Sequence, residues 1–345
     1  MPRLDTEKAV ELGVSGFFGN FEALDQVADL GAEDIDFSAV QDDVLAECTF
    51  DGKLARLPIG LNLSGIVVNK TLLEKEGLSV PTNWDEFLDV CDALKAKGYT
   101  PIQGAKTAVY SDLVYGMAMA ELGTDSALQD ALNNGEDAAV DAMETVYSRL
   151  QMVLDNGYTD PALNAEYPDD NYDGAILRFF EGDVPFWVCS TEKYSGMKKR
   201  ESKSEAYSAA PFEYQFMYAP IGDNGAYAFV DPWVGFSVNK NSDNYDYAVE
   251  FIRFLAQEEQ MDTIASVKGV PSAAKNSTDA RYEAIRSPEN VEKQFVNDGT
   301  LLNHMKDFFQ SDASKLGQGE LFSARAAAED YVSRCAEVAA EMEAQ

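Results

Sequence analysis

The amino-acid sequence predicts an α/β protein built from two lobes, and three features lead to this prediction. The chain has 345 residues, whereas a single hydrophobic core stops growing at about 250 to 300 residues. Apolar residues make up 46% of the chain, which is enough to fill two packed interiors. Strand-like apolar runs alternate with segments of helical periodicity, joined by short connections. This alternation favours largely parallel sheets covered by helices on both faces.

The first well-marked element is the nearly continuous apolar segment from Leu57 to Val68. The interruption "GLNLSG" predicts a buried strand pair with a polar turn or a crossing point between its halves. A short helix then runs to Gly77, since glycine suits the left-handed position after a helix. Thr82 and Asp85 have the spacing of a helix start signal, which predicts a helix from Trp84 to Lys97.

The middle of the chain continues the alternation of strands and helices. "YTPIQGA" after Gly98 is typical of a short buried strand, and "DVPFWV" at 183–188 of another. Between them, apolar residues return at helical spacing over 113–120 and over 139–154. These two segments are predicted to be helices that face a core.

The last third contains looser sequence, strands and two helices. Residues 201–225 read as a loop with a strand near "FMYAPI". "AYAFVDPWVGFSVNK" is strand-like on both sides of Asp231-Pro232, a break that a central strand of a sheet could not tolerate. One amphipathic helix is predicted from Tyr247 to Ile264, with Phe251 on its buried face, and another from about Leu321 to Met342.

The charge of the chain limits its partners. Sixty acidic residues against 27 basic ones give a net charge of −33, which repels phosphate backbones and anionic lipid surfaces. We therefore expect no nucleic-acid partner, and we expect the self-repelling surface to keep the chain monomeric. No window approaches the roughly 18 to 20 apolar residues of a membrane span.

The cysteines and the first residues bear on the compartment. Four cysteines are widely spaced without a CxxC pair, so the sequence indicates neither a zinc site nor a dense disulfide framework. Cys91 and Cys335 lie on apolar helix faces and are expected to be buried free thiols. The start "MPRLDTEKAVELGVSGFF" lacks the features of a secretory signal. Either the protein is intracellular or this chain lacks its natural beginning.

Sequence motifs for catalysis or metal binding are weak. His304 is the single histidine, so a triad or a histidine metal site lacks partners, and no nucleotide-binding or nucleophile-elbow motif is present. "DDNYDGAILRFFE" places Asp169, Asn171, Asp173 and Gly174 as in an EF-hand loop, but Phe180 stands where the bidentate glutamate belongs. We favour a helix N-cap at Asp173 and expect no metal and no cofactor. Two of the many carboxylates could still form a glycosidase pair, a geometry that sequence cannot identify.

Polar residues at the ends of apolar strands are the better candidates for a binding site. In open α/β sheets, ligands collect at the carboxyl ends of strands. An aromatic face beside a carboxylate or amide suits a sugar, because the ring stacks on the C–H face while the polar groups bond the hydroxyls. Each candidate alone could be ordinary loop sequence, and Trp233 alone suits a core position. The candidates come from four separate segments: Asn62 and Ser64; Tyr110 and Ser111; Ser190, Thr191, Glu192 and Lys193; Asp231 and Trp233.

The order of these elements resembles the family 1 extracellular solute-binding proteins, the sugar-binding components of ABC importers. "DGKLARLPIGLNLSGIVVNKTLLEKEGLSVPTNWDEFLDVCDALKAKGYTPI" is similar to a signature in the N-terminal lobe of that family. "FFEGDVPFWV" and "WVGFSVNKNSDNYDYAVEFIRFLAQEEQMDTIASVKGVPSAAK" resemble its second half. The resemblance covers about residues 10–340 in the family's order. Each motif alone is only weakly specific, but the set of motifs in this order is specific to the family.

The resemblance implies a two-lobed, periplasmic-binding-protein-like fold of type II that binds its ligand between the lobes. It implies residues 1–107 and 232–273 for the N-lobe, and 108–231 and 274–345 for the C-lobe. Asn62 and Ser64 would face the ligand from the N-lobe, while Tyr110 and Ser111 would follow the first crossing between lobes. Ser190, Thr191 and Glu192 would line the C-lobe wall, and Asp231 and Trp233 would lie at the second crossing.

One departure from the family pattern concerns the start of the chain. Members begin with a secretion signal, often with a lipid-bearing cysteine, followed by a strand, a helix and a strand. Here the chain opens in what resembles a later region, so we expect about 30 or more residues, one βαβ unit of the N-lobe, to be absent. The implied location is extracellular, at the cell surface or in the periplasm.

The leading hypothesis is therefore a non-enzymatic protein that binds a mono- or oligosaccharide and delivers it to the transmembrane subunits of an ABC permease. A second hypothesis is a binding protein for another solute, such as a polyamine or a peptide, which acidic Glu192 and Asp231 would favour. A third is a glycoside hydrolase. Sequence alone names neither the sugar nor the permease.

Overall fold

The protein is described by a computed structural model, in which the described backbone covers residues 10–13, 26–50, 52–105, 108–122, 125–167, 172–223, 225–286, 295–296, 311, 315 and 323–343. The chain divides into two compact units. Unit 1 consists of residues 1–63, 230–280 and 296–300, and unit 2 consists of residues 64–229, 281–295 and 301–345. The bounds expected from the sequence differ most at the first boundary, which lies between Leu63 and Ser64 instead of after residue 107.

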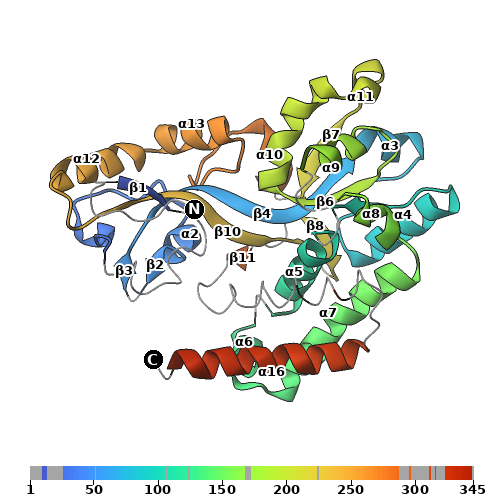
Figure 1. Cartoon of the computed structure of the whole chain (residues 1–345), viewed down its shortest axis with the longest axis horizontal. Coiled ribbons are helices and arrows are strands. Elements are labelled where there is room, and N and C mark those ends of the chain that lie inside the picture. The colour runs from blue at the N-terminus through green and yellow to red at the C-terminus, as the bar shows by residue number, and fades with distance from the viewer. Residues whose placement is uncertain are drawn as a thin grey trace. The chain divides into compact units, whose positions relative to one another are not determined.

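One long strand explains this first boundary. β4 (Leu57–Asn69) is a single continuous strand of 13 residues, visible as the long blue arrow in Figure 1. Its first half pairs with β10 (Phe229–Val238) in unit 1, and its second half pairs with β6 (Phe186–Ser190) and β7 (Tyr214–Met217) in unit 2. The interruption "GLNLSG" is therefore no turn. It contains the crossing point, and the chain changes unit without leaving the extended conformation.

Unit 1 is built on β10 and the first half of β4. β1 (Val10–Gly13) pairs antiparallel with the far end of β10. The core holds Leu57 and Ile59 of β4, Val234 and Val238 of β10, and Ile252 and Leu255 of a covering helix. The other elements are η2 (Leu30–Ala32), α2 (Asp42–Ala46), the hairpin of β2 (Thr49–Phe50) and β3 (Lys53–Leu54), α12 (Tyr245–Leu255) and α13 (Glu258–Lys268).

Unit 2 is built on the second half of β4 with β6, β7 and β5 (Ile102–Gly104). A separate hairpin is formed by β8 (Ala219–Gly222) and β9 (Gly225–Tyr227). Its helices are α3 (Lys70–Lys75), α4 (Trp84–Ala96), α5 (Ala108–Leu122), α6 (Ser126–Asn134), α7 (Asp137–Asp155), α8 (Pro161–Ala165), α9 (Tyr172–Phe179), α10 (Thr191–Arg200), η3 (Glu201–Lys203), α11 (Glu205–Ala209), α14 (Glu283–Arg286) and α16 (Ala324–Glu343). η4 (Ala280–Tyr282) and β11 (Phe295–Val296) complete the described elements.

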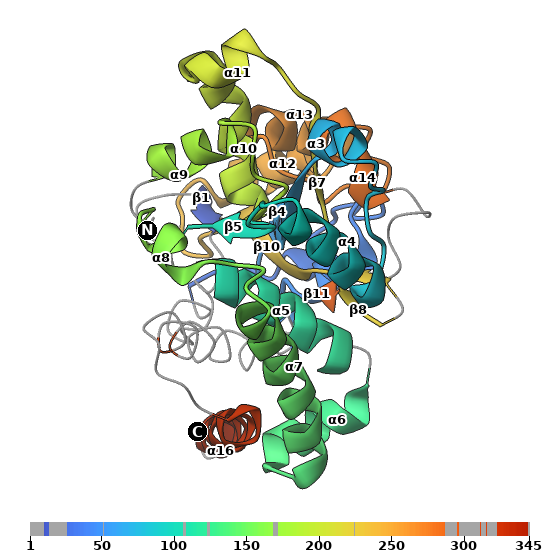
Figure 2. The same cartoon turned by 90° about the vertical axis from the view of Figure 1, so that its right-hand side faces the viewer.

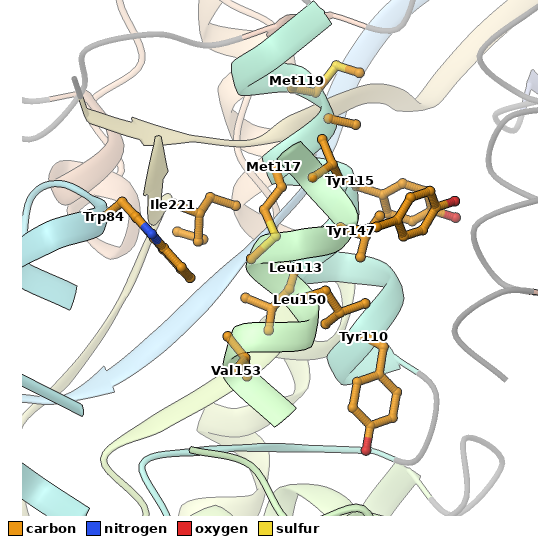
Figure 3. Packing of buried hydrophobic residues seen from close by; sticks show 14 of the residues in the cluster. Trp84, Tyr110, Leu113, Tyr115, Met117, Met119, Tyr147, Leu150, Val153 and Ile221 are labelled. Atoms are coloured by element: carbon orange, nitrogen blue, oxygen red, sulfur yellow. The ribbon is translucent and has the colours of Figure 1, made fainter. Parts of the chain in front are cut away.

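The main core of unit 2 lies around α5 and α7. α5 is buried along nearly its whole described length, and α7 packs against both α5 and α16 (Figures 1 and 2). Figure 3 shows Trp84, Met117, Leu150 and Ile221 converging in this cluster. Trp84 is 5% exposed and belongs to this core. Cys91 and Cys335, expected to be buried free thiols, are both buried thiols that are not joined in disulfides.

The strand directions correct one expectation. β5 pairs parallel with β6, whereas β4 pairs antiparallel with β10, β6 and β7. The expectation of largely parallel sheets was wrong because β10, β6 and β7 all run opposite to the long β4. β10 also passes through Pro232, which was expected to break it. A register shift between Pro232 and Val234 accommodates the proline, as bulges do where a residue cannot donate to the ladder.

Helix boundaries show three smaller differences. The N-cap of α4 is Asn83, whose side chain accepts from the Glu86 backbone N–H at 3.0 Å, rather than Thr82. The helix expected over 247–264 is two helices, α12 and α13, because the helical conformation is interrupted at residues 256–257. Phe251, expected on the buried face, is 43% exposed, although its ring still lies 6.1 Å from that of Phe236.

Candidate functional site

The carboxyl end of β6 positions most of the predicted polar residues of unit 2. Ser190 is the last residue of β6 and the N-cap of α10, and it pairs in register with Ser64 of β4. Ser190 is half-buried and makes no capping bond to α10 within the described structure. Because it does not cap the helix, the Ser190 hydroxyl can offer a hydrogen bond to a ligand at the start of α10.

The neighbours of Ser190 differ in their access to solvent. Thr191, the first residue of α10, is fully buried, whereas Glu192 in the same first turn is exposed. Ser64 is 5% exposed. A carboxylate near a helix N-terminus is favoured by the helix dipole, so Glu192 is held at this edge as an exposed acceptor. Of this group, Glu192 and Ser190 are the side chains that a solute in solution can reach.

α5 adds a second set of polar groups close to the same strand. α5 packs on β6, and Ser111 in its first turn is 4% exposed. Burial raises the pKa of the Cys189 thiol in β6, and the charges of Lys193 and Asp112 then act on it in opposite directions, Lys193 lowering the pKa and Asp112 raising it. Asp112 of α5 and Lys193 of α10 therefore both lie near the end of β6. The structure brings the predicted residues Ser64, Ser111 and Ser190–Lys193 into one region of unit 2.

Tyr110 lies apart from these accessible groups. It is 1% exposed, and burial raises the pKa of its hydroxyl, an effect that the neighbouring Asn164 side chain opposes. Asn164 is itself buried and fixed, since its Oδ1 accepts from the Gly104 N–H at 3.3 Å and its Nδ2 donates to Thr159 Oγ1 at 2.8 Å. Figure 3 shows the Tyr110 ring pointing away from Trp84, at the edge of the hydrophobic cluster. In this structure Tyr110 is a core residue.

Unit 1 contains the remaining predicted residues. Asn62 is half-buried, and its backbone is the register partner of Asp231 in the β4–β10 ladder. For Asp231 the structure describes only the backbone, which lies in β10. Trp233 is half-buried at the margin of the unit 1 core, and Lys268 Nζ lies 5.7 Å from the centroid of its ring. The ring of Trp233 thus combines a core contact with a cation–π contact.

Two polar residues of unit 2 were not selected from the sequence. Asp112 could have been found, because it interrupts an otherwise apolar helix directly after Ser111. Asn164 carries no such signal, since an asparagine in a short helix after Asp160-Pro161 reads as ordinary turn sequence. Its role depends on contacts with Gly104 and Thr159 that only the tertiary structure creates.

The apparent EF-hand start has a structural explanation at Asp173. Asp173 lies inside the first turn of α9, not at the N-cap as expected. Its carboxylate accepts hydrogen bonds from Lys203 Nζ at 2.9 Å and from Arg200 Nε at 2.8 Å, and both lower its pKa. Asp169, Asn171 and His304 lie outside the described residues. Within the described ranges, no group of three or more His, Cys, Asp and Glu side chains is placed to hold a metal ion.

Comparison with protein families identifies the chain's relatives. The sequence model of a family described as bacterial extracellular solute-binding protein matches residues 4–293. A multiple sugar-binding protein of Streptococcus mutans is 22% identical over 273 residues, which are 76% of this chain and 62% of that protein. A probable sugar-binding periplasmic protein of Brucella suis is 25% identical over 127 residues, 36% of this chain and 28% of the relative. The chain thus spans less than two thirds of the length of these curated relatives.

Solved structures show the same fold at low sequence identity. The sugar-binding protein MalE from Xanthomonas citri has a TM-score of 0.76 at 15% identity, with 97% of this chain and 84% of that chain covered. A sugar transporter of Bacillus licheniformis, solved with stachyose, has a TM-score of 0.67 at 20% identity, with coverage of 90% and 81%. The predicted two-lobed, periplasmic-binding-protein-like α/β class is confirmed.

In the part of the chain that the structure describes, no helix combines the length and the apolar character needed to cross a membrane. The matched residues 4–293 span both units, and they include every predicted site residue from Asn62 to Trp233. The chain belongs to the bacterial extracellular solute-binding protein family.

Proposed function

We propose that this chain is the substrate-binding component of an ABC importer and that it binds a mono- or oligosaccharide without turning it over. The family match over residues 4–293 carries the proposal, and relatives described as sugar-binding proteins support the ligand class. The proposed partner is the membrane permease of the importer. The proposed location is outside the cytoplasmic membrane, free in the periplasm or lipid-anchored at the cell surface, and the proposed state is monomeric.

The proposed mechanism depends on the continuous strand β4. Asn62 belongs to unit 1 and Ser64 to unit 2, yet both lie on this one strand. A ligand that hydrogen-bonds to groups of both units would stabilise the arrangement in which both sets of bonds are made, which is how ligands shift populations in hinged binding proteins. Ser190 and Glu192 are the unit 2 groups proposed to bond the hydroxyls, and Trp233 is the ring proposed to stack on the sugar face.

Tryptophan fluorescence during titration with a panel of sugars tests the proposal. Trp84 and Trp187 of unit 2 are 5% and 2% exposed, whereas Trp233 is half-buried, so Trp233 is the best-placed reporter. At least one sugar should bind, and Trp233→Ala should weaken it by roughly 1 to 3 kcal/mol, by analogy with aromatic stacking on other ligands. If no sugar changes the fluorescence or the melting temperature, carbohydrate binding is wrong.

A pair of glutamate variants tests the proposed role of Glu192. Glu192→Gln should weaken binding of the identified sugar several-fold by removing a charged acceptor. Glu205→Gln, at an exposed glutamate in the first turn of α11, is the matched control and should have no effect.

Tight binding of a polyamine or peptide with no sugar response would favour the second hypothesis. Turnover of a chromogenic glycoside would favour the hydrolase.

A further inference from the structure

A bulge in β10 lies at Trp233, whose ring is proposed to stack on the sugar. In the ladder between β10 and β4 (Figure 1), Pro232 faces Leu61 and Val234 faces Gly60, so Trp233 is an extra residue without a register partner on β4. Such a bulge disrupts the ladder locally and re-aims a side chain, which is why bulges are frequent next to functional sites. The direction of the Trp233 side chain therefore depends on contacts beyond the ladder itself.

Arg56 donates a hydrogen bond at this bulge. Its Nη2 lies 2.9 Å from the Pro232 carbonyl oxygen, and the contact is buried. Arg56 is itself 4% exposed and directly precedes β4 in the sequence. A buried backbone carbonyl requires a donor, and a charged donor forms a stronger hydrogen bond than a neutral one. The guanidinium group thus stabilises the position of the Pro232 carbonyl.

The aliphatic part of the Arg56 side chain packs against Gly235, on the other side of Trp233 in the sequence. A Cβ atom at Gly235 would lie 2.9 Å from Cγ and from Cδ of Arg56, whereas ordinary van der Waals contacts are 3.4–4 Å. Glycine therefore leaves the space that the arginine occupies. The Arg56 side chain contacts β10 both before and after Trp233, and close packing of this kind holds the guanidinium group in one place.

The hydrogen bond of Arg56 bears directly on the orientation of Trp233. The Pro232 carbonyl and the Trp233 N–H belong to one planar peptide unit. A bond that fixes the carbonyl therefore fixes the plane from which the Trp233 side chain starts. The ring is held a second time, because Lys268 Nζ of α13 lies 5.7 Å from its centroid. Trp233 is thus oriented before a ligand arrives, and preorganisation of this kind lowers the cost of binding.

We propose that Arg56 is a positioning residue of the sugar site and that its hydrogen bond to Pro232 sets the orientation in which the Trp233 ring meets the sugar. The inference rests on the proposed function, because it takes Trp233 as the stacking ring. Arg56 is buried and acts through Trp233. A binding site must hold its contact groups close to the productive geometry, so a rotated Trp233 ring binds the sugar less well although every atom of the ring is still present.

Calorimetric titration with a sugar identified in the panel measures the effect on binding. Arg56→Met removes the donor and should weaken the sugar roughly 3- to 10-fold, less than Trp233→Ala, because the ring is retained. Arg56→Lys keeps a cationic donor and should lie between Arg56→Met and the parent chain. Arg253→Met is the matched control, since Arg253 Nε also donates to a backbone carbonyl of unit 1, Asp34 O at 2.8 Å. It should leave the affinity within about twofold.

Fluorine NMR of the chain labelled with 5-fluorotryptophan reads the environment of Trp233 without a ligand. The chain has three tryptophans, and Trp233→Phe assigns the resonance of Trp233. Arg56→Met should shift or broaden that resonance, whereas the resonances of Trp84 and Trp187, which belong to unit 2, should stay unchanged. If no sugar in the panel binds, the proposed function has failed, and this measurement still decides whether Arg56 orients Trp233.

A double-mutant cycle separates positioning from a general loss of structure. If Arg56 acts through Trp233, Arg56→Met should cost no further sugar affinity in a Trp233→Ala background. A variant that merely loosened unit 1 would lower the affinity by the same factor in both backgrounds. That outcome overturns the proposal, as does an unchanged Trp233 resonance in Arg56→Met or an equal effect of Arg253→Met. Where Arg56→Met does not fold, Arg56→Lys takes its place in every measurement and must show the same changes to a smaller extent.

Discussion

Replacement of Gly65 by alanine should destabilise unit 2 at the strand that carries the proposed site. Gly65 follows Ser64 in β4 and is the register partner of Cys189 in β6. A Cβ atom at Gly65 would lie 2.5 Å from the Met217 carbonyl oxygen and 2.6 Å from Phe216 Cζ, where ordinary van der Waals contacts are 3.4–4 Å. β7 must therefore move by about 1 Å, and overpacking of this kind costs typically about 1–3 kcal/mol.

The same strand offers a control in unit 1. A Cβ atom at Gly60 would lie 2.7 Å from a methyl group of Val270, and its next nearest neighbours are at 3.5 and 3.6 Å. Movement of one side chain can relieve that contact, whereas the Met217 oxygen belongs to a backbone that is paired with β4. Gly60→Ala should therefore cost less than Gly65→Ala, and its loss should appear in unit 1.

Urea unfolding followed by tryptophan fluorescence measures the effect. In a Trp233→Phe background the signal comes from Trp84 and Trp187, both buried in unit 2, so the transition reports on that unit. Gly65→Ala should lower the unfolding midpoint without changing the slope. An unchanged midpoint, or an equal shift of the unit 2 transition in Gly60→Ala, would show that β7 yields easily and would refute the reasoning.

Three further predictions concern charge and thiol chemistry. Hydrogen bonds from Lys97 and Tyr99 lower the pKa of Glu76 below its ordinary value of 4.5, so its contribution to stability is present above that value and is lost as the pH falls through the folded pKa. Glu76→Gln should thus be less stable to urea than the parent at pH 6, and the difference between the two should shrink at pH 3. Arg149→Met should destabilise unit 2 by roughly 3 kcal/mol in urea unfolding. It removes the cation that pairs with Glu121, whose carboxylate lies 2.8 Å from Arg149 Nη1. A loss below about 1 kcal/mol would contradict this. The four cysteines are buried, and burial raises the pKa of Cys91 and Cys189. A thiol reagent at pH 8 should therefore react slowly with the native chain, and it should react with all four cysteines after unfolding. Rapid labelling of the native chain would contradict this prediction.

Local sequence signals predicted much of the secondary structure. The helical spacing over 113–120 and 139–154 and the apolar face near the C-terminus correspond to α5, α7 and α16. The predictions of α7 and α16 succeeded because an amphipathic pattern of period 3.6 is set by residues within one or two turns. α5 differs, because it is buried along nearly its whole described length and has no single apolar face. The strand direction could not be read in the same way, because a strand has the same alternation whether its partner is parallel or antiparallel.

The candidate site was predictable only in part. The polar residues at the end of β6 followed from the rule that strand ends gather ligand groups, and the structure places Ser190 and Glu192 where solvent reaches them. The same rule selected Tyr110, which is 1% exposed. Exposure depends on elements far away in the sequence, such as α8 with Asn164 next to Tyr110, and a local pattern contains no information about them.

The sequence by itself determined the α/β class, the two-unit division, the family and the absence of strong catalytic motifs, because these depend on composition, periodicity and short motifs. Only the tertiary structure decided that β4 is one uninterrupted strand with its unit boundary at Leu63 and Ser64. It also decided that β10 continues through Pro232, where a register shift against β4 accommodates the proline. Both features depend on which distant segments pair with β4, and pairing over such distances is a property of the whole fold.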